Sequence, residues 1–184
     1  MTEAVIAATR RWVEEFVVSH ELCPFARREL ESERLRFTLS EASSPELLLE
    51  MLKAELAYLD AHAEVETTLI IHPGVLADFY DFNAFLGEVD RLLKRAGYEG
   101  VYQVASFHPQ YQFAGTEPAA AENYSNRSPY PMLHLLREDS VARAIAAHPD
   151  IEGVPARNIA LLNDIGAETL RAFWLSLFTG DASG

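Results

Sequence analysis

Two apolar runs of the chain, residues 67–71 and 101–107, are each followed at once by His-Pro. Both runs are typical of strands, and if they are parallel in one sheet, His72 and His108 emerge at its carboxyl edge. Ligands of open α/β sheets bind beyond that edge. An imidazole titrates near neutral pH, so we predict His108 as a general acid or base and His72 as a substrate-binding residue. The structural alternative is that each histidine only caps its strand.

The segment 104–137 breaks the apolar periodicity of the chain and concentrates polar side chains. Arginine recognises carboxylate and phosphate groups with two hydrogen bonds. We therefore predict that Arg127 and Arg137 hold an anionic group of a substrate, although a surface salt bridge is the alternative for Arg137. The other substrate-binding candidates in this segment are Tyr111, Asn123, Asn126 and Ser128.

A helix is predicted to begin after the Pro-Tyr-Pro turn at 129–131, because Leu133, Leu136 and the later Val141 keep helical spacing. His134 and Arg137 are three residues apart and would share one face of this helix. His134 is therefore the second predicted catalytic residue, which would orient the substrate or share in proton transfer.

Cys23 is the third catalytic candidate. Pro24 favours the first position of a helix, which would place Cys23 at the N-cap. The helix dipole and the nearby Arg27 and Arg28 would lower the pKa of the thiol and make it a nucleophile. The alternative is a buried cysteine that acts as a small hydrophobic residue.

Cofactor chemistry has no support in the sequence. The phosphate-loop, dinucleotide, serine-hydrolase and zinc-protease motifs are all absent, so the cofactor is unknown. A metal site built from His72, His108 and His134 is an alternative, but their spacing fits no compact motif, and we assign no metal ligand.

The elements that must position these residues form a β-α-β-α-β pattern. Helical connections of this length favour parallel strands with right-handed crossovers. The fold class is thus α/β, with a small, mainly parallel three-stranded sheet and N-terminal and C-terminal helices packed around it. The predicted strands are 34–40, 67–71 and 101–107, and the main predicted helices are 3–20, one from 45, 79–96, 140–148, 155–163 and 167–178.

Length and composition place limits on domain number and partners. The 184 residues suit a single domain, 1–184. The net charge of -13 argues against nucleic acid or an anionic membrane as a partner. One cysteine excludes an internal disulfide, and no secretory signal or membrane-spanning run is apparent. We expect a cytoplasmic protein whose oligomeric state is unknown.

Three blocks carry a resemblance to a known family: CPFA at 23–26, ASFHPQYQFAG at 105–115 and NRSPYPMLHLLRE at 126–138. Together they resemble a bacterial family of uncharacterised proteins, catalogued as a domain of unknown function. The resemblance implies a single soluble domain and supplies no activity. Members of that family tend to be acidic around 119–121, where this chain has three alanines. This loop is therefore not expected to supply a carboxylate.

Taken together, these features predict a small-molecule enzyme with a pocket lined by His and Arg for an anionic substrate, at the carboxyl edge of the sheet. A non-catalytic ligand-binding or oligomerisation module is one alternative. A metal-dependent hydrolase with histidine ligands is another.

Overall fold

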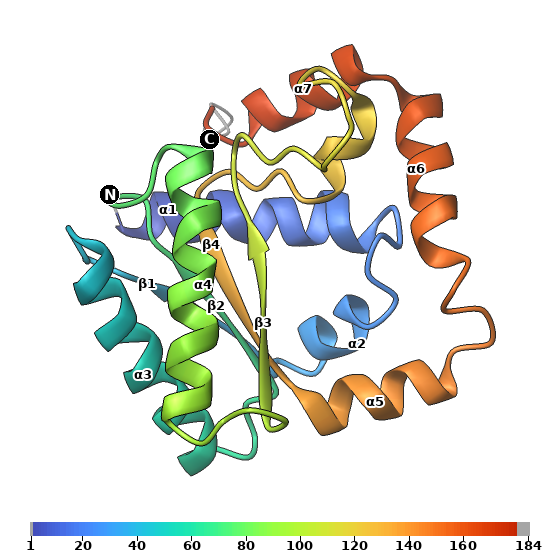
Figure 1. Ribbon diagram of the computed structural model, residues 1–184. Helices are drawn as coiled ribbons and strands as arrows, with labels where there is room; N and C mark the ends of the chain where they lie inside the picture. The colour runs from blue at the N-terminus through green and yellow to red at the C-terminus, as the bar shows by residue number, and fades with distance from the viewer. Residues whose placement is uncertain (1, 180–184) are drawn as a thin grey trace.

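Four short strands form one mixed sheet in the computed structural model, which describes residues 2–179 (Figure 1). The strand order is β1-β2-β4-β3. β1 is parallel to β2, and β4 is antiparallel to both of its neighbours. The strands are β1 (Leu35–Leu39), β2 (Thr67–Ile71), β3 (Tyr102–Phe107) and β4 (Met132–Arg137).

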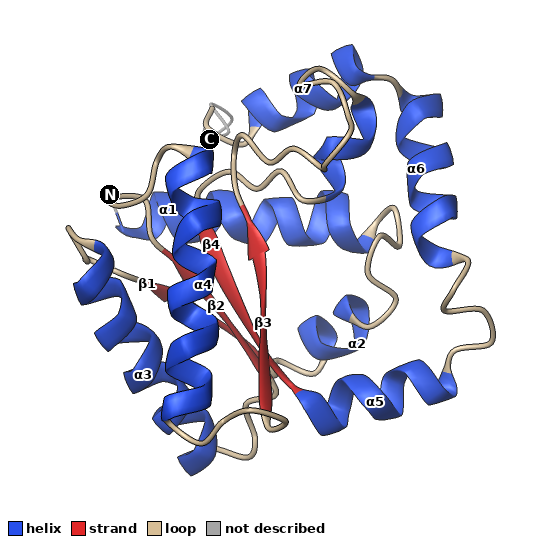
Figure 2. Cartoon of the chain, in the orientation of Figure 1, coloured by secondary structure: helices blue, strands red, loops and turns tan. Residues whose placement is uncertain are grey.

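The helices lie close to the predicted ranges (Figure 2). The first predicted helix is divided in two, because its second half, η1, is a π-helix. The α-helices are α1 (Thr2–Arg11), α2 (Ala26–Glu31), α3 (Pro45–Ala61), α4 (Phe79–Arg95), α5 (Glu138–Ala147), α6 (Val154–Ile165) and α7 (Ala167–Ser176); η1 spans Trp12–Val18 and the 3-10 helix η2 spans Ala121–Ser125.

Strand β4 corrects the predicted sheet. Residues 132–137 form a strand and not the start of a helix, so the sheet has four strands and is mixed, not three strands that are mainly parallel. A run of six mostly apolar residues is too short for its periodicity to separate a central strand from a buried helix turn. β2 and β3 still point the same way, since each is antiparallel to β4. Their carboxyl ends therefore share one edge, as the sequence predicts.

One face of the sheet is closely covered by α3 and α4 (Figure 1). Ser44 accepts a hydrogen bond from the backbone N–H of Leu47, and Asp78 accepts from those of Tyr80 and Asp81, so both helices begin with a side-chain cap. The core on this face consists of fully buried aliphatic and aromatic side chains, including Leu48, Leu52, Leu56, Leu59, Ile70, Phe82, Leu133 and Leu135.

The other face is covered by α1 and η1, with α6 and α7 packed beyond them. Trp12, Phe16 and Leu162 are buried there. Alternate residues of β4 point to the two faces. Leu133 and Leu135 face α3 and α4, whereas Met132, His134 and Leu136 face the side of η1. This second face is where the packing leaves a cavity.

Candidate functional site

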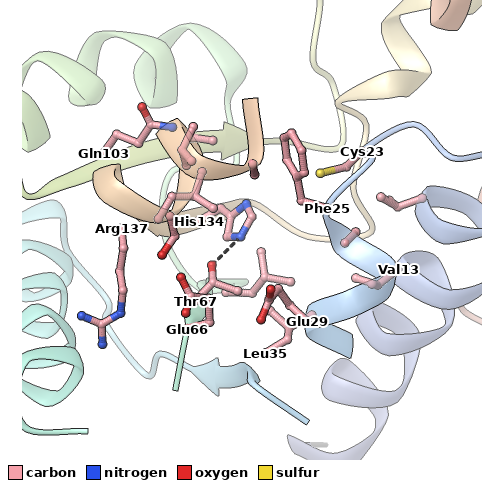
Figure 3. A pocket seen from close by; sticks show the side chains of 18 of the residues that line it. Val13, Cys23, Phe25, Glu29, Leu35, Glu66, Thr67, Gln103, His134 and Arg137 are labelled. Carbon is pink, nitrogen blue, oxygen red and sulfur yellow. Dashed lines mark hydrogen bonds between the residues drawn. The ribbon is translucent and has the colours of Figure 1, made fainter. Parts of the chain in front are cut away.

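A cavity of about 330 Å³ lies against the second face of the sheet (Figure 3). Its wall is made by all four strands together with η1, the turn before α2, α2 itself and α5. Most of its lining is apolar. The lining includes Trp12, Cys23, Phe25, Glu29, Glu66, Thr67, Leu69, Ala105, His134, Leu136, Arg137 and Ala144.

The π-helix η1 supplies one wall of this cavity through Trp12, Val13 and Val17. A π-helix is wider than an α-helix and is often found at functional sites. Trp12 is only 2% exposed, and its indole stands edge-on to Phe107. Its Nε1–H has no hydrogen-bond acceptor among residues 2–179. A buried indole donor usually has a partner, so this unpaired N–H is an exception on the wall of the cavity.

His134 lies near the centre of the sheet, between Leu69 of β2 and Ala105 of β3. The hydroxyl of Thr67 donates to the carbonyl of Leu135 at 2.5 Å, which uses its only proton. The ring Nε2 of His134 lies 2.7 Å from the same hydroxyl oxygen, so Nε2 carries the hydrogen and donates. Nδ1 is thus an unprotonated acceptor, and no described residue donates to it.

Burial lowers the pKa of His134 to about 4. The cause is the loss of water around the charged form of the ring. The imidazole is therefore neutral at pH 7, with a fixed tautomer and a free lone pair in the cavity. It can accept a hydrogen bond, or a proton, from a bound molecule.

Cys23 lines the same cavity, so the structure brings together two of the three predicted catalytic residues. The predicted N-cap position is wrong, because Phe25 is the N-cap of α2 and Cys23 lies in the turn before it. Burial raises the pKa of the Cys23 thiol, and hydrogen bonds from the backbone of Phe25 and Ala26 offset this only in part. The thiol is protonated at neutral pH, the opposite of what a nucleophile needs.

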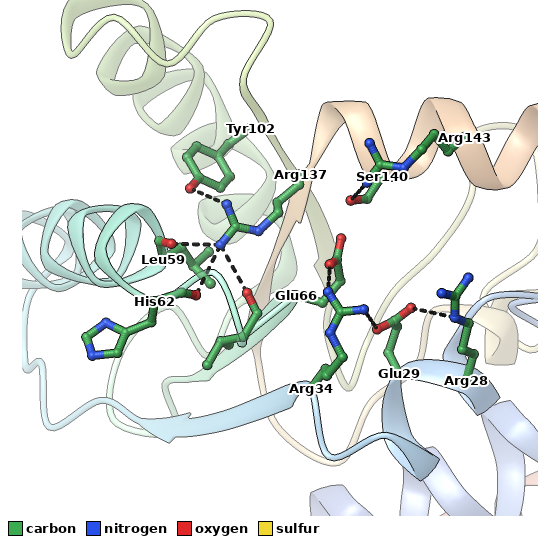
Figure 4. A network of polar contacts seen from close by, with 11 residues as sticks. Arg28, Glu29, Arg34, Leu59, His62, Glu66, Tyr102, Arg137, Ser140 and Arg143 are labelled. Carbon is green, nitrogen blue, oxygen red and sulfur yellow. Dashed lines mark hydrogen bonds and ion pairs between the residues drawn. The ribbon is translucent and has the colours of Figure 1, made fainter.

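Two carboxylates, Glu29 and Glu66, also line the cavity, and Arg34 lies between them (Figure 4). The Nη2 of Arg34 is hydrogen-bonded to Oε2 of Glu66, and its Nη1 lies 3.5 Å from Oε2 of Glu29. The second oxygen of Glu66, Oε1, is buried and has no hydrogen-bond donor within the described chain. Oε2 of Glu29 is likewise buried without a hydrogen bond.

Arg137 is the last residue of β4, so it lies at the edge of the sheet opposite to the carboxyl ends of β2 and β3. Its guanidinium donates to the backbone carbonyls of Leu59 (2.7 Å), Val65 (3.0 Å) and His62 (3.4 Å), and to the hydroxyl of Tyr102 (3.1 Å) (Figure 4). It thus satisfies carbonyls at and beyond the C-terminus of α3. The predicted helical face shared with His134 is wrong, because residues 132–137 form a strand, in which successive side chains alternate. Arg137 still lines the same cavity as His134, while its guanidinium donates to the carbonyls of Leu59 and Val65.

His72 and His108 do lie at one edge of the sheet, and both imidazoles pack against the Phe82 ring. Both nitrogens of His108 are used: Nε2 donates to Leu76 O at 3.1 Å and Nδ1 accepts from Gln110 N–H at 3.0 Å. His72 donates from Nδ1 to Val75 O, and its buried Nε2 has no partner among residues 2–179. Burial lowers the pKa of His108 and takes that of His72 to about 4.

The remaining predicted residues tie down the loop between β3 and β4. Arg127 donates from Nε to Tyr111 O at 3.0 Å and from Nη2 to Pro118 O at 2.6 Å, and its guanidinium stacks on Tyr124. Asn123 is fully buried and accepts from the Phe113 N–H at 2.9 Å. These polar groups hold irregular backbone in place.

Two further candidates, Asn126 and Ser128, also form hydrogen bonds to backbone groups, and a third, Tyr111, packs against aromatic rings. Asn126 donates to Ser106 O at 3.3 Å, and its own carbonyl accepts from His108 N–H. The hydroxyl of Ser128 donates to Tyr130 O at 2.5 Å. The ring of Tyr111 packs against Phe79 and Phe113, and burial raises its pKa. Their role in substrate binding stays a prediction.

A second cavity, of about 560 Å³, lies between this loop, the N-terminal half of α6 and the end of η1. Val17, Cys23 and Phe107 line both cavities, so they separate the two. Of the predicted residues, Cys23 and Asn126 line the second cavity.

A three-histidine metal site is not formed. His134 lies on the opposite side of the sheet from the packing of His72 and His108 around Phe82. Within residues 2–179 no group of three His, Cys, Asp or Glu side chains is placed to hold a metal ion.

Sequence patterns missed Trp12, Glu29, Glu66 and Thr67 as parts of the site. Trp12 follows the apolar spacing of its helix and so is predicted as core, which is where it lies. Glu66 directly precedes a buried strand, and a charge beside such a strand is the one local signal that points to a polar group near the cavity.

Comparisons with known proteins give a family and no activity. No curated protein and no solved structure matches the chain. None of the described helices is both long and apolar enough to cross a membrane, and the cytoplasmic location stays a prediction. One family model, described as "Protein of unknown function (DUF1415)", matches residues 4–172. The chain therefore belongs to this family.

Proposed function

We propose that this protein binds a small, mainly apolar molecule in the cavity between the sheet and η1. The observation that carries the proposal is the neutral imidazole of His134, whose unprotonated Nδ1 faces a largely apolar space of about 330 Å³. Small-molecule sites typically have such volumes, with apolar walls and a few polar groups that fix orientation. The ligand would donate a hydrogen bond to Nδ1, from a hydroxyl or amine group.

The free indole N–H of Trp12 is a second polar anchor for the ligand. Acceptor and donor thus come from two different elements, β4 and η1. Leaving either group unpaired costs free energy, about 1–3 kcal/mol for a buried donor or acceptor. A ligand with a hydroxyl group regains that energy, whereas a pure hydrocarbon does not.

This ligand differs from the anionic substrate that the sequence predicts. The guanidinium groups of Arg127 and Arg137 already donate to backbone carbonyls. The acidic side chains that line the cavity, Glu29 and Glu66, disfavour an anion. Binding, and not nucleophilic catalysis, is the better supported activity because burial keeps the Cys23 thiol protonated.

A cavity-filling pair of variants on α5 tests the proposal. Ala144 lines the cavity, whereas Ala146 of the same helix is exposed. We expect 2-phenylethanol to shift the backbone amide NMR signals of the cavity residues, with a Kd of roughly a millimolar, as befits a probe of this size. Ala144→Trp should abolish these shifts, and Ala146→Trp should preserve them. Binding that survives Ala144→Trp would place the ligand elsewhere and reject the proposal.

A further inference from the structure

We infer that the natural ligand of this cavity carries a positively charged nitrogen group, held by Glu29 and Glu66. The inference rests on the proposed function and specifies the class of ligand: an amphipathic amine or amidine with an apolar body.

The first support is the unmet hydrogen-bonding capacity of the two carboxylates. Glu66 and Glu29 have side chains only 12% and 17% exposed, and each has one buried oxygen without a hydrogen bond within the described chain. An ionised carboxylate in such a place is costly unless donors surround it. The donors that are missing from the protein are those that a bound ammonium group would supply.

The second support is the local balance of charge. The two carboxylates share one partly buried guanidinium, that of Arg34. Arg28 comes no closer than 3.8 Å to Glu29, and its side chain is 80% exposed, so water screens this pair. A bound cation would complete the pairing of two negative with two positive groups.

Neighbouring arginines do not fill this role. Arg137 donates to the carbonyls beyond α3, and Figure 4 shows its guanidinium turned away from Glu66. Arg143 donates to the hydroxyl of Ser140 on its own helix. Oε1 of Glu66 is therefore left without a donor, and Oε2 of Glu29 has only its 3.5 Å ion pair with Arg34.

The third support is independent of the acidic pair and concerns the rest of the cavity. Trp12 lines the same cavity and is only 2% exposed, and its N–H has no partner within the described chain. Figure 3 shows the carboxylates on the Thr67 side of His134, and Phe25 and Cys23 on the other side. A ligand with a charged head at the carboxylates and an apolar body toward Phe25 fits both of these regions, and an acceptor atom on that body would pair with the Trp12 N–H.

Three probes of matched size test this assignment: 2-phenylethylamine, 2-phenylethanol and 3-phenylpropionate. We expect the amine to bind about tenfold more tightly than the alcohol, since a charge-assisted hydrogen bond is roughly twice as strong as a neutral one. The carboxylate should bind least. NMR titration of the full chain gives all three Kd values.

Glu66→Gln removes the charge and keeps the shape, and should erase most of the preference for the amine. Glu55→Gln is the matched control: Glu55 also forms an ion pair with an arginine, Arg36, and is 7% exposed, but it lies on α3 and does not line the cavity. It should keep the tenfold preference. If Glu66→Gln does not fold, Glu29→Gln replaces it.

The outcomes separate the two proposals. Equal affinity for amine and alcohol, or a preference that survives Glu66→Gln and Glu29→Gln, overturns the cationic assignment and leaves the cavity as a binding site. No shift of cavity residues with any of the three probes overturns both.

Discussion

The two faces of the sheet use the same strands and yet are built differently. On the face of α3 and α4, the leucines of α3 and Phe82 of α4 pack with Leu133 and Leu135 of β4, all fully buried. On the face of η1, the neighbouring positions His134 and Leu136 line a cavity and are only partly covered. Alternation along a single strand thus divides its residues between a packed core and the wall of a cavity, so substitutions on the two faces should affect stability differently.

The largest expected effect is on the packed face. Leu133→Ala removes a fully buried side chain from close packing and should lower the free energy of unfolding by about 3–4 kcal/mol. Urea denaturation measures this directly. A loss below about 1 kcal/mol would show that α3 and α4 do not pack as closely on β4 as described.

A pH series tests whether His134, on the cavity face, is as well shielded from water as His72, which packs against Phe82 at the edge of the sheet. His134 and His72 both have a pKa of about 4 when folded, against about 6.5 when unfolded. Between these values the unfolded chain binds more protons, so stability falls as the pH is lowered from 6.5 to 4, by about 1.4 kcal/mol per pH unit for each histidine. His134→Asn should remove the contribution of this histidine, which is a decrease of about 2 kcal/mol in the free energy of unfolding between pH 6 and 4.5.

The same change at His72 provides the comparison. His72→Asn should reduce the slope equally, because burial depresses both pKa values to the same extent. If only His72→Asn changes the slope, the imidazole of His134 titrates as in water, and the cavity is wet at its centre.

The smallest expected effect is Leu136→Ala, on the cavity face. The substitution is identical to that at Leu133 and only three residues away, but Leu136 is partly exposed and already borders empty space. We expect a loss of about 1 kcal/mol in urea denaturation, mostly from the transfer of its own surface. A loss as large as that of Leu133→Ala would contradict the difference between the faces.

Much of the fold could be predicted from local signals. Helical spacing, the Ser44-Pro45 cap and the two His-Pro strand ends locate α3, α4, β2 and β3 well. β4 could not be predicted in this way, because its paired residues are 25 to 69 positions away in the sequence and its apolar run fits either a strand or a helix. Its conformation is fixed by tertiary pairing.

The site was harder to predict for a related reason. Polar residues between β3 and β4 suggest a pocket, yet Arg127 and Asn123 use their hydrogen bonds on the loop itself. Conversely, Trp12 reads as core and is buried, and only its unpaired N–H marks it as part of the site. Whether a polar atom has a partner depends on contacts between distant segments, which a sequence pattern does not contain.

The position of β4 has a consequence for synthesis of the chain. β4 is the last strand to be translated, but it belongs in the middle, between β2 and β3. Until residue 137 has left the ribosome, β2 and β3 each expose an unpaired edge, and the buried faces of α3 and α4 lack their central partner. Such edges invite pairing with other chains. β1 and β2 can pair without β4, but β3 joins the sheet only when this one short segment is in place between them.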